Sequence, residues 1–184
     1  AIKPILEGRD VIGLANTGTG KTAAFVLPII NRLKTVPSQK VVLIMAPTRE
    51  LALQIDEQFK IYAQNMKLYS ALCVGGTNMQ RQIRDLRRRP HVIIGTPGRL
   101  KDLMKQRVLK LEFVNTLVLD EADRMLDMGF LPDLQRIINL IPAQRQTLLF
   151  SATFSPEIKK LAQSYLRSPV TVEVARQNAA ADTV

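Results

Sequence analysis

The sequence predicts an α/β fold in which helices flank a mostly parallel central β-sheet on both faces. Short apolar runs alternate with amphipathic helical stretches along the chain, which is the pattern of repeated βαβ units. Each well-marked run ends in a polar or glycine-containing cluster, and open α/β sheets bind their ligands at that edge. A length of 184 residues with 46% apolar side chains leaves room for one domain with a sizeable core.

The individual elements follow from the spacing of apolar residues. The predicted strands are residues 10–14, 41–46, 68–74, 91–95, 116–119, 147–150 and 170–174. Helical spacing occurs in residues 23–33, 51–66, 134–141 and 158–166. Ser155, Pro156 and Glu157 indicate a helix start: a hydroxyl cap, a proline in the first turn and an acid favoured by the helix dipole. We expect the domain to span residues 1–174, and the small and polar residues 175–184 to begin a linker.

The segment between the first strand and the first long helix has the spacing of a phosphate-binding loop, with alanine in place of the first glycine. In such loops backbone N–H groups close around phosphate oxygens, a lysine reaches the β/γ-phosphates and a hydroxyl reaches Mg²⁺. The following helix directs its N-terminus at the phosphates. The predicted nucleotide-binding residues are Ala15, Asn16, Thr17, Gly18, Thr19, Gly20, Lys21 and Thr22.

Two adjacent carboxylates, Asp120 and Glu121, follow the apolar strand of residues 116–119 about a hundred residues later. Acids in the first turn of a helix can simply favour the helix dipole. Here the buried strand before them would hold them rigidly, so we assign Asp120, with Thr22, to Mg²⁺. Glu121 would position and deprotonate an attacking water. Together with Lys21, these acids predict nucleoside triphosphate hydrolysis.

Other polar clusters should lie at the same edge of the sheet. They supply hydroxyls, arginines and glycine-exposed backbone N–H groups, which hold sugar-phosphate without reading bases. Each cluster is weak evidence alone. The clusters are Pro47-Thr48-Arg49-Glu50-Leu51-Ala52, Gly75-Gly76, Thr96-Pro97-Gly98-Arg99 and Ser151-Ala152-Thr153.

The net charge of +10 and the pI near 10.1 indicate a polyanionic partner. Residues 81–110 carry ten basic and two acidic side chains, a net of +8. Part of this charge can be a solvated helix face, but its proximity to Thr96–Arg99 favours nucleic acid. Aromatic residues make up only 5% and tryptophan is absent, so base stacking on an aromatic platform is not the expected mode.

Several classes of protein are disfavoured by composition. A single cysteine, Cys73, excludes an intrachain disulfide framework and fits a reducing, cytoplasmic compartment. One histidine and one cysteine make a zinc site of the usual ligands very unfavourable. No apolar run approaches the roughly 18–20 residues of a membrane span. Cys73 is expected in a buried strand and His91 at a strand start, with no chemistry assigned to either.

Taken together, these motifs resemble the first RecA-like domain of a DEAD-box ATP-dependent RNA helicase, with the family's order kept over nearly the whole chain. Residues 123–130 and 149–154 look bacterial and are most similar to the RhlE-type subgroup. The resemblance implies a RecA-like phosphate-loop fold, ATP and Mg²⁺ as cofactors, and RNA bound through its backbone. It assigns the catalytic roles to Lys21, Asp120 and Glu121.

The resemblance also implies an RNA track and a coupling element. The helix near Gly98 would bend the bound strand, and Ser151 and Thr153 would contact the segment of Asp120–Asp123 to couple hydrolysis to duplex opening. The residues implied along the RNA backbone are Pro47, Thr48, Arg49, Gly75, Gly76, Thr96, Pro97, Gly98 and Arg99, and those implied in coupling are Asp123, Ser151 and Thr153.

There are departures from the family pattern. Asn16 stands where the family commonly has glutamine. The chain starts at Ala1 without methionine, so we expect a fragment whose adenine-reading segment lies upstream and whose second RecA-like domain lies downstream. Because an arginine finger is worth roughly 10³–10⁵ in rate in related hydrolases, the isolated chain is expected to turn over little ATP and not to unwind RNA.

Three alternatives stay open at this point. Another phosphate-loop ATPase or GTPase is possible in principle, although a guanine-reading Asn-Lys-x-Asp motif is absent and Ser151-Ala152-Thr153 favours a helicase. A DNA helicase would use the same backbone contacts, because only the 2′-OH separates the two nucleic acids there. A nucleic-acid clamp that never hydrolyses ATP would be indifferent to Glu121→Gln. The oligomeric state is not indicated by the sequence.

Overall fold

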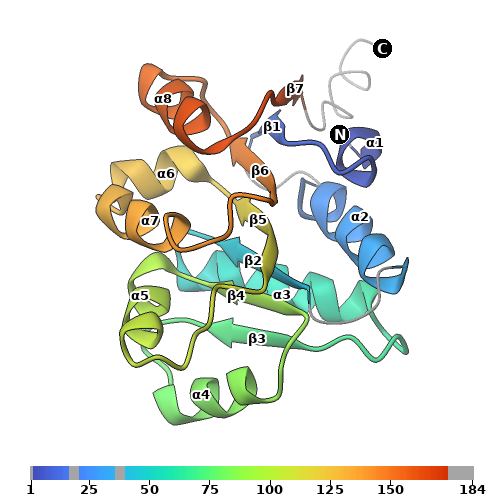
Figure 1. The fold of residues 1–184 in the computed structure, drawn as a ribbon, viewed down its shortest axis with the longest axis vertical. Helices are drawn as coiled ribbons and strands as arrows, with labels where there is room; N and C mark the ends of the chain where they lie inside the picture. Colours follow the sequence, from blue (N-terminus) through green and yellow to red (C-terminus); the bar gives the residue numbers. More distant parts are fainter. Residues whose placement is uncertain (1, 17–20, 36–39, 174–184) are drawn as a thin grey trace, which may run out of the picture.

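The computed structural model describes residues 2–16, 21–35 and 40–173. In this part of the chain seven strands form one sheet in the order β3-β4-β2-β5-β6-β1-β7, and every neighbouring pair is parallel (Figure 1). The prediction of an α/β fold with a parallel central sheet is therefore confirmed. The strands are β1 Val11–Leu14, β2 Val41–Met45, β3 Ser70–Cys73, β4 Val92–Gly95, β5 Val114–Leu119, β6 Gln146–Ser151 and β7 Val170–Glu173.

Helices cover both faces of the sheet, as predicted (Figure 1). One core cluster joins the sheet to α1, α2 and α3, and the other joins it to α4 through α8. The two faces alternate along a strand: Val42 and Ile44 of β2 enter the first cluster, while Leu43 and Met45 enter the second. The helices are α1 Ile2–Leu6, α2 Lys21–Thr35, α3 Arg49–Tyr62, α4 Met79–Arg87, α5 Pro97–Lys105, α6 Ala122–Asp127, α7 Leu131–Ile138 and α8 Pro156–Tyr165.

Most element boundaries agree with the sequence to within three residues, and two of the differences have clear causes. The helix expected over residues 51–66 ends at Tyr62, because the chain then turns through Asn65 in the left-handed region at φ 68°. Strand β5 starts at Val114, earlier than predicted, because the half-buried Asn115 interrupts the apolar pattern without interrupting the strand. The predicted cap at Ser155 is present, since its hydroxyl accepts a hydrogen bond from the Ile158 N–H at 3.3 Å.

The parallel sheet brings the predicted clusters to one edge, because the carboxyl ends of all strands lie there. The clusters that follow β2, β5 and β6 come from neighbouring strands, and those that follow β3 and β4 lie beside them. Gly95 at the end of β4 allows a close approach there: a Cβ at this position would lie 2.6 Å from the Cys73 carbonyl oxygen and 2.8 Å from Leu100. Within the described ranges, no helix is both long and apolar enough to cross a membrane.

Candidate functional site

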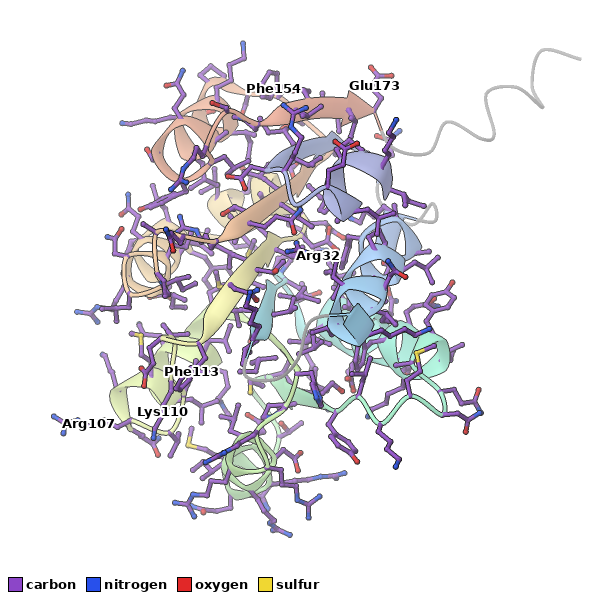
Figure 2. All side chains as sticks on the ribbon, turned by 45° about the vertical axis from the view of Figure 1, so that its right-hand side comes forward. Arg32, Arg107, Lys110, Phe113, Phe154 and Glu173 are labelled. Atoms are coloured by element: carbon purple, nitrogen blue, oxygen red, sulfur yellow. The ribbon has the colours of Figure 1, made fainter. Side chains whose placement is uncertain are left out.

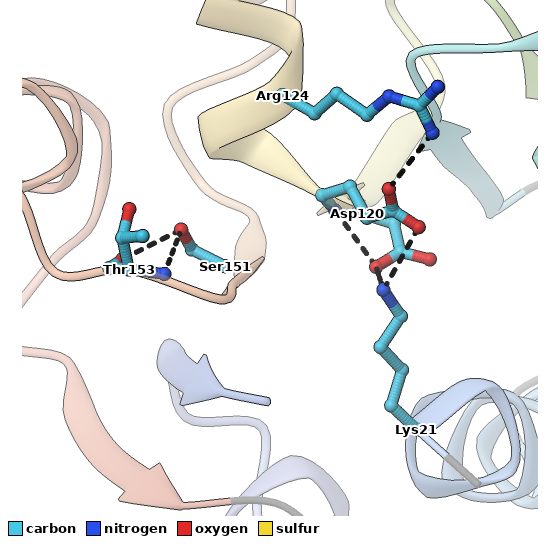
Figure 3. A network of polar contacts seen from close by, with 6 residues as sticks. Lys21, Asp120, Arg124, Ser151 and Thr153 are labelled. Atoms are coloured by element: carbon cyan, nitrogen blue, oxygen red, sulfur yellow. Dashed lines mark hydrogen bonds and ion pairs between the residues drawn. The ribbon is translucent and has the colours of Figure 1, made fainter. Parts of the chain in front are cut away.

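Lys21 and the acidic pair that follows β5 lie in direct contact at the carboxyl edge of the sheet (Figure 3). Lys21 Nζ lies 3.1 Å from Asp120 Oδ1 and 3.3 Å from Glu121 Oε2. The lysine comes from the first turn of α2, and the acids come from a position one hundred residues later in the chain. All three residues are buried, so the contact is a short-range interaction with little solvent screening.

The backbone fixes the two acids in different ways. The Asp120 N–H donates to the Met45 carbonyl oxygen at 2.9 Å, which continues the pairing of β5 with β2. Glu121 is the N-cap of α6 and has φ 50° and ψ 52°, a left-handed conformation that costs a non-glycine residue roughly 1–3 kcal/mol. Its N–H donates to Asp120 Oδ1 at 2.9 Å. The turn that follows β5 therefore holds both carboxylates next to Lys21 at the expense of local strain.

Burial sets the electrostatics of this cluster. Desolvation raises the pKa of the Asp120 carboxyl above its usual value, and the nearby Lys21 ammonium opposes that rise without cancelling it. Two buried carboxylate oxygens, Asp120 Oδ2 and Glu121 Oε1, have no hydrogen-bond partner. Glu121 Oε1 does form an ion pair with Arg124 Nη1 at 3.5 Å, but this arginine is exposed to solvent and makes no hydrogen bond to that oxygen. Buried carboxylate oxygens without a hydrogen-bond partner are unusual, and they indicate a site that accepts an additional cationic or proton-donating group.

The donor set fits a magnesium nucleotide. Mg²⁺ prefers oxygen ligands and commonly uses one or two carboxylates together with substrate phosphates. Asp120 offers a buried, unpartnered carboxylate oxygen, and Thr22 follows Lys21 in the first turn of α2. Among the described residues, no group of three or more His, Cys, Asp or Glu side chains could hold a metal by itself. A cation here would therefore need the phosphate oxygens to complete its coordination.

The predicted phosphate loop is described only at its two ends. Thr17, Gly18, Thr19 and Gly20 lie outside the described residues. Ala15 follows β1, is buried, and donates its N–H to the Ser151 carbonyl oxygen at 3.0 Å. Asn16 comes next, and Lys21 resumes the described chain as the first residue of α2. One end of the loop is thus anchored to the end of β6, and the other end places Lys21 against the acidic pair.

The clusters that follow β2 and β3 meet through Arg49 and Gly76. Thr48, after Pro47, caps α3 by accepting a hydrogen bond from the Leu51 N–H at 3.2 Å. Gly76 has φ +75°, and a Cβ there would lie 3.0 Å from Arg49 Nη1. By contrast, a Cβ on Gly75 would have no neighbour within 4 Å. The structure therefore brings two segments that are distant in sequence side by side, with the Arg49 guanidinium against the Gly76 backbone.

The cluster that follows β4 joins the same surface through Gln82, a residue that the sequence analysis did not single out. Arg99, in the first turn of α5, donates from Nη1 to Gln82 Oε1 at 3.1 Å and to the Thr77 carbonyl oxygen at 3.4 Å. Gln82 is buried in α4 and donates to the Val74 carbonyl oxygen at 2.9 Å and to the Thr77 hydroxyl. A glutamine on an amphipathic helix ordinarily faces solvent, so no local signal distinguishes it.

The remaining predicted residues of this cluster form the start of α5. Thr96 is its N-cap residue and donates its N–H to the Cys73 carbonyl oxygen at 3.1 Å, although its side chain makes no capping hydrogen bond. Pro97 and Gly98 occupy the first turn of α5. Proline is tolerated there because the N–H group that it lacks would have no partner within the helix. Nothing lies within 4 Å of a Cβ built on Gly98, so the backbone there is open to a ligand.

Among the described residues, the side-chain hydrogen bond between the cluster that follows β6 and the acidic segment comes from Thr153. The Thr153 hydroxyl lies 3.5 Å from Asp123 Oδ2, at the limit of a hydrogen bond. Ser151 was expected to contact residues 120–123 as well. Its hydroxyl instead donates to the Thr153 carbonyl oxygen at 2.7 Å and accepts from the Thr153 N–H at 3.3 Å, within its own turn (Figure 3). Ser151 thus shapes the turn that presents Thr153 to Asp123.

Two residues to which no chemistry was assigned have structural roles. Cys73 is buried in β3, and burial raises the pKa of its thiol to about 12, so it is no nucleophile at neutral pH. His91 directly precedes β4 and accepts a hydrogen bond from the Tyr69 N–H at 3.0 Å through Nδ1. Both observations agree with the sequence expectation.

A parallel sheet whose edge joins the end of a glycine-rich segment, a lysine and a strand-terminal acidic pair defines the class of phosphate-loop nucleotide-binding domains. Within that class, the DEAD/DEAH box helicase family model matches residues 1–161. The chain belongs to this family.

Relatives and solved structures agree with this assignment. The chain is 46% identical over 183 residues to the ATP-dependent RNA helicase CshA of Limosilactobacillus reuteri, covering 100% of this chain and 37% of that protein. It is 50% identical over 186 residues to the ATP-dependent rRNA helicase RRP3 of Vanderwaltozyma polyspora, with the same coverage of 100% and 37%. The crystal structure of a DEAD box protein from the hyperthermophile Methanococcus jannaschii superposes with a TM-score of 0.85 at 34% identity, covering 95% of this chain and 48% of that one. The chain thus spans little more than a third of the length of these curated relatives.

Proposed function

We propose that this chain is the ATP-binding part of an ATP-dependent RNA helicase, which couples ATP hydrolysis to local separation of RNA duplexes. The observation that carries the proposal is the buried contact of Lys21 with Asp120 and Glu121, which leaves two carboxylate oxygens without hydrogen-bond partners. Family membership and the names of the relatives support the same activity.

In this proposal the roles on the nucleotide side divide by chemistry. Lys21 would exchange its carboxylate partners for phosphate oxygens, and the backbone of residues 15–20 would surround them. Asp120 and the Thr22 hydroxyl would hold Mg²⁺, which when bound neutralises charge that develops on the phosphoryl oxygens. Glu121, next to Asp120 in a strained turn, would orient a water and accept its proton.

On the RNA side, the proposed track consists of the clusters that follow β2, β3 and β4. The contacts of Arg49 with Gly76 and of Arg99 with Gln82 support a single continuous surface. Arginines, hydroxyls and open backbone N–H groups bind phosphate and sugar without reading bases, so the binding would be independent of sequence. The proposed residues are Pro47, Thr48, Arg49, Gly75, Gly76, Thr96, Pro97, Gly98 and Arg99.

The proposal also covers the turn after β6, the domain bounds and the cellular compartment. The contact of Thr153 with Asp123 supports a link between the turn after β6 and the acidic segment. We further propose that residues 1–174 form the first RecA-like domain, that residues 175–184 begin the linker to a second one, and that the protein acts in the cytoplasm. The RhlE-type subgroup stays a prediction, because the relatives described above carry the names CshA and RRP3.

The test uses the natural full-length protein and measures ATP hydrolysis with RNA, with DNA of the same sequence, and without nucleic acid. We expect RNA to raise the rate well above the other two conditions, and we expect separation of a short RNA duplex only with ATP. Replacing ATP by GTP should abolish most of the stimulated rate. Equal stimulation by DNA would point to a DNA helicase, and no stimulation by either nucleic acid would contradict the proposal.

A further inference from the structure

The outer face of α4 carries the densest cluster of like charge on the described surface. Five of the eleven residues from Met79 to Arg89 are exposed arginines, and Asp85 is the only acid among them. Figure 2 shows nitrogen-tipped side chains that project outward from this helix, which packs on the edge strand β3. We call this set the α4 arginine cluster; its members are Arg81, Arg84, Arg87, Arg88 and Arg89.

The cluster has a defined geometry relative to the core. Gln82, Ile83 and Leu86 form the buried side of α4. Arg81 and Arg84 stand three residues apart and Arg88 follows four residues later, a spacing that places their side chains along one stripe of the helix. At about 1.5 Å per residue this stripe runs for roughly 10 Å, which is the length of a few nucleotides of one strand at about 3.4 Å each.

The stability of the helix does not account for all of these arginines. None of the five has a carboxylate within ion-pair distance among the residues that the structure describes. Lys101, also in the basic stretch of residues 81–110, differs in this respect, because it pairs with Asp133 at 3.0 Å. Cations in the last turn suit the helix dipole, but Arg81 stands in the first turn of α4, where the dipole disfavours a cation and no acid is present.

The cluster is connected to the proposed RNA track. Gln82, the neighbour of Arg81, accepts the hydrogen bond from Arg99 at 3.1 Å and donates to the Val74 carbonyl oxygen just before Gly75. The helix begins at the carboxyl edge of the sheet, right after the Gly75-Gly76 cluster, and runs back along β3. Helix α4 therefore starts beside the track and leads away from it, outside the edge strand β3 (Figure 1).

We infer that the α4 arginine cluster is a second RNA-binding surface, which holds the phosphate backbone of RNA that extends beyond the proposed track. Five unpaired guanidiniums match a row of phosphates, both in charge and through bidentate hydrogen bonds. No aromatic residue lies on α4, so the surface would recognise phosphate and not bases. This inference rests on the proposed function, because the track supplies the rest of the RNA contact.

The test is the double variant Arg81→Glu/Arg84→Glu in the natural full-length protein. An acid at position 81 suits the first turn, and an acid at position 84 stands four residues before Arg88, so the helix should stay folded. The matched control is Arg136→Glu/Lys160→Glu, which makes the same change in net charge at exposed positions of α7 and α8. Thermal unfolding of all three proteins verifies that they are folded.

Affinity is measured for two RNAs over a range of salt concentrations. One is the shortest RNA that supports stimulated ATP hydrolysis, and the other extends it by about ten nucleotides, either single-stranded or as a duplex. For the longer RNA we expect the α4 variant to lose about tenfold in affinity. We also expect the slope of the logarithm of RNA affinity against the logarithm of salt concentration to become shallower by about 1.4 for a single-stranded extension, because two phosphate contacts are lost. The short RNA and the ATP hydrolysis that it stimulates should be nearly unchanged.

The outcomes separate this inference from the proposed function. An α4 variant that binds the longer RNA as the control does, or that loses affinity equally for both RNAs, would overturn the second surface. An unmodified protein whose ATP hydrolysis does not respond to RNA would contradict the helicase proposal but would leave the affinity comparison measurable. A larger loss on the duplex extension than on the single strand would assign the cluster to double-stranded RNA.

Discussion

The buried cluster of Lys21, Asp120 and Glu121 and the exposed arginines of α4 are opposite solutions to binding phosphate. The first places one cation and two acids in contact, out of solvent, with a strained backbone at Glu121. The second spreads five cations over the exposed side of α4 and the two residues that follow it, without ion-pair partners and in water. In the first region the interaction depends on the exact positions of a few charges at short range. In the second region it depends on the number of charges, and salt screens their combined field.

This difference shows what each region can do. A buried cluster can discriminate between states of a reaction, because small displacements change large energies there. An exposed row of arginines cannot do so, but it can hold a polymer without fixing its register.

Glu121→Gln tests whether position and protonation decide the function of the buried cluster. The amide keeps the shape of the side chain but cannot accept a proton from water, so the rate of ATP hydrolysis should fall by about 10²–10⁴-fold. Nucleotide binding should persist, and the protein should stay bound to RNA in the presence of ATP. Glu157→Gln, at an exposed position in the first turn of α8, is the matched control and should leave the rate unchanged. A normal rate in the Glu121 variant would assign the proton transfer to another group.

Asp120→Asn tests the electrostatic cost of burial. Because burial raises the pKa of Asp120 in the folded state, the folded protein binds a proton there more tightly than the unfolded chain does. The stability of the natural protein relative to the variant should therefore fall as pH rises from about 3.8, by about 1.4 kcal/mol per pH unit, and level off above the raised pKa. Urea unfolding at a series of pH values measures this difference. A relative stability that rises with pH would show that Lys21 outweighs burial.

Gln82→Leu cuts the connection between the proposed track and α4. The Val74 carbonyl and Arg99 would lose their partner, so we expect the protein to lose about 1–3 kcal/mol of stability. RNA affinity should fall severalfold while affinity for a nucleotide analogue stays the same, because the Lys21 site is separate from these contacts. Parallel titrations with RNA and with the analogue measure both effects. Equal weakening of both ligands would mean that the two regions are energetically coupled through α4.

Gly76→Ala tests the smallest element of the surface. The residue has φ +75°, and a Cβ would press on the Arg49 guanidinium at 3.0 Å, so we expect a destabilisation of about 1 kcal/mol and a modest loss of RNA affinity. Gly75→Ala is the matched control, since a Cβ there meets nothing within 4 Å. Thermal unfolding and RNA titration compare the two variants. Equal stability of both variants would remove the backbone argument for Gly76.

The fold was largely predictable from the sequence, because strands that are buried on both faces are nearly uniform in apolar character. The exceptions depend on contacts between distant parts of the chain. Strand β6 begins at Gln146, one residue before the predicted start, and the Gln146 side chain donates to the carbonyl oxygens of Ile5 and Arg9 at 2.9 and 2.8 Å. A buried glutamine that is satisfied by residues about 140 positions away leaves no local pattern to detect.

The contact of Lys21 with the acidic pair was predictable from the sequence, but its detailed geometry was not. A parallel sheet must bring the loops after β1 and β5 to one edge, so the proximity of Lys21 to Asp120 follows from topology. The left-handed conformation of Glu121 does not follow, because a non-glycine residue rarely adopts it and no local sequence pattern indicates it. The role of Gln82 was missed for a similar reason, since its partners are set by how α4 and α5 meet.

The double contact of Lys21 has a consequence for how a triphosphate would be received. A single ammonium stands between two acids, so phosphate oxygens that draw it away would remove it from both carboxylates at the same moment and leave Glu121 with the exposed Arg124 alone. Free Mg²⁺ alone would have to compete with an internal cation that already contacts both carboxylates. One side chain would thus make metal affinity conditional on the arrival of the nucleotide, which is a simple form of ordered loading.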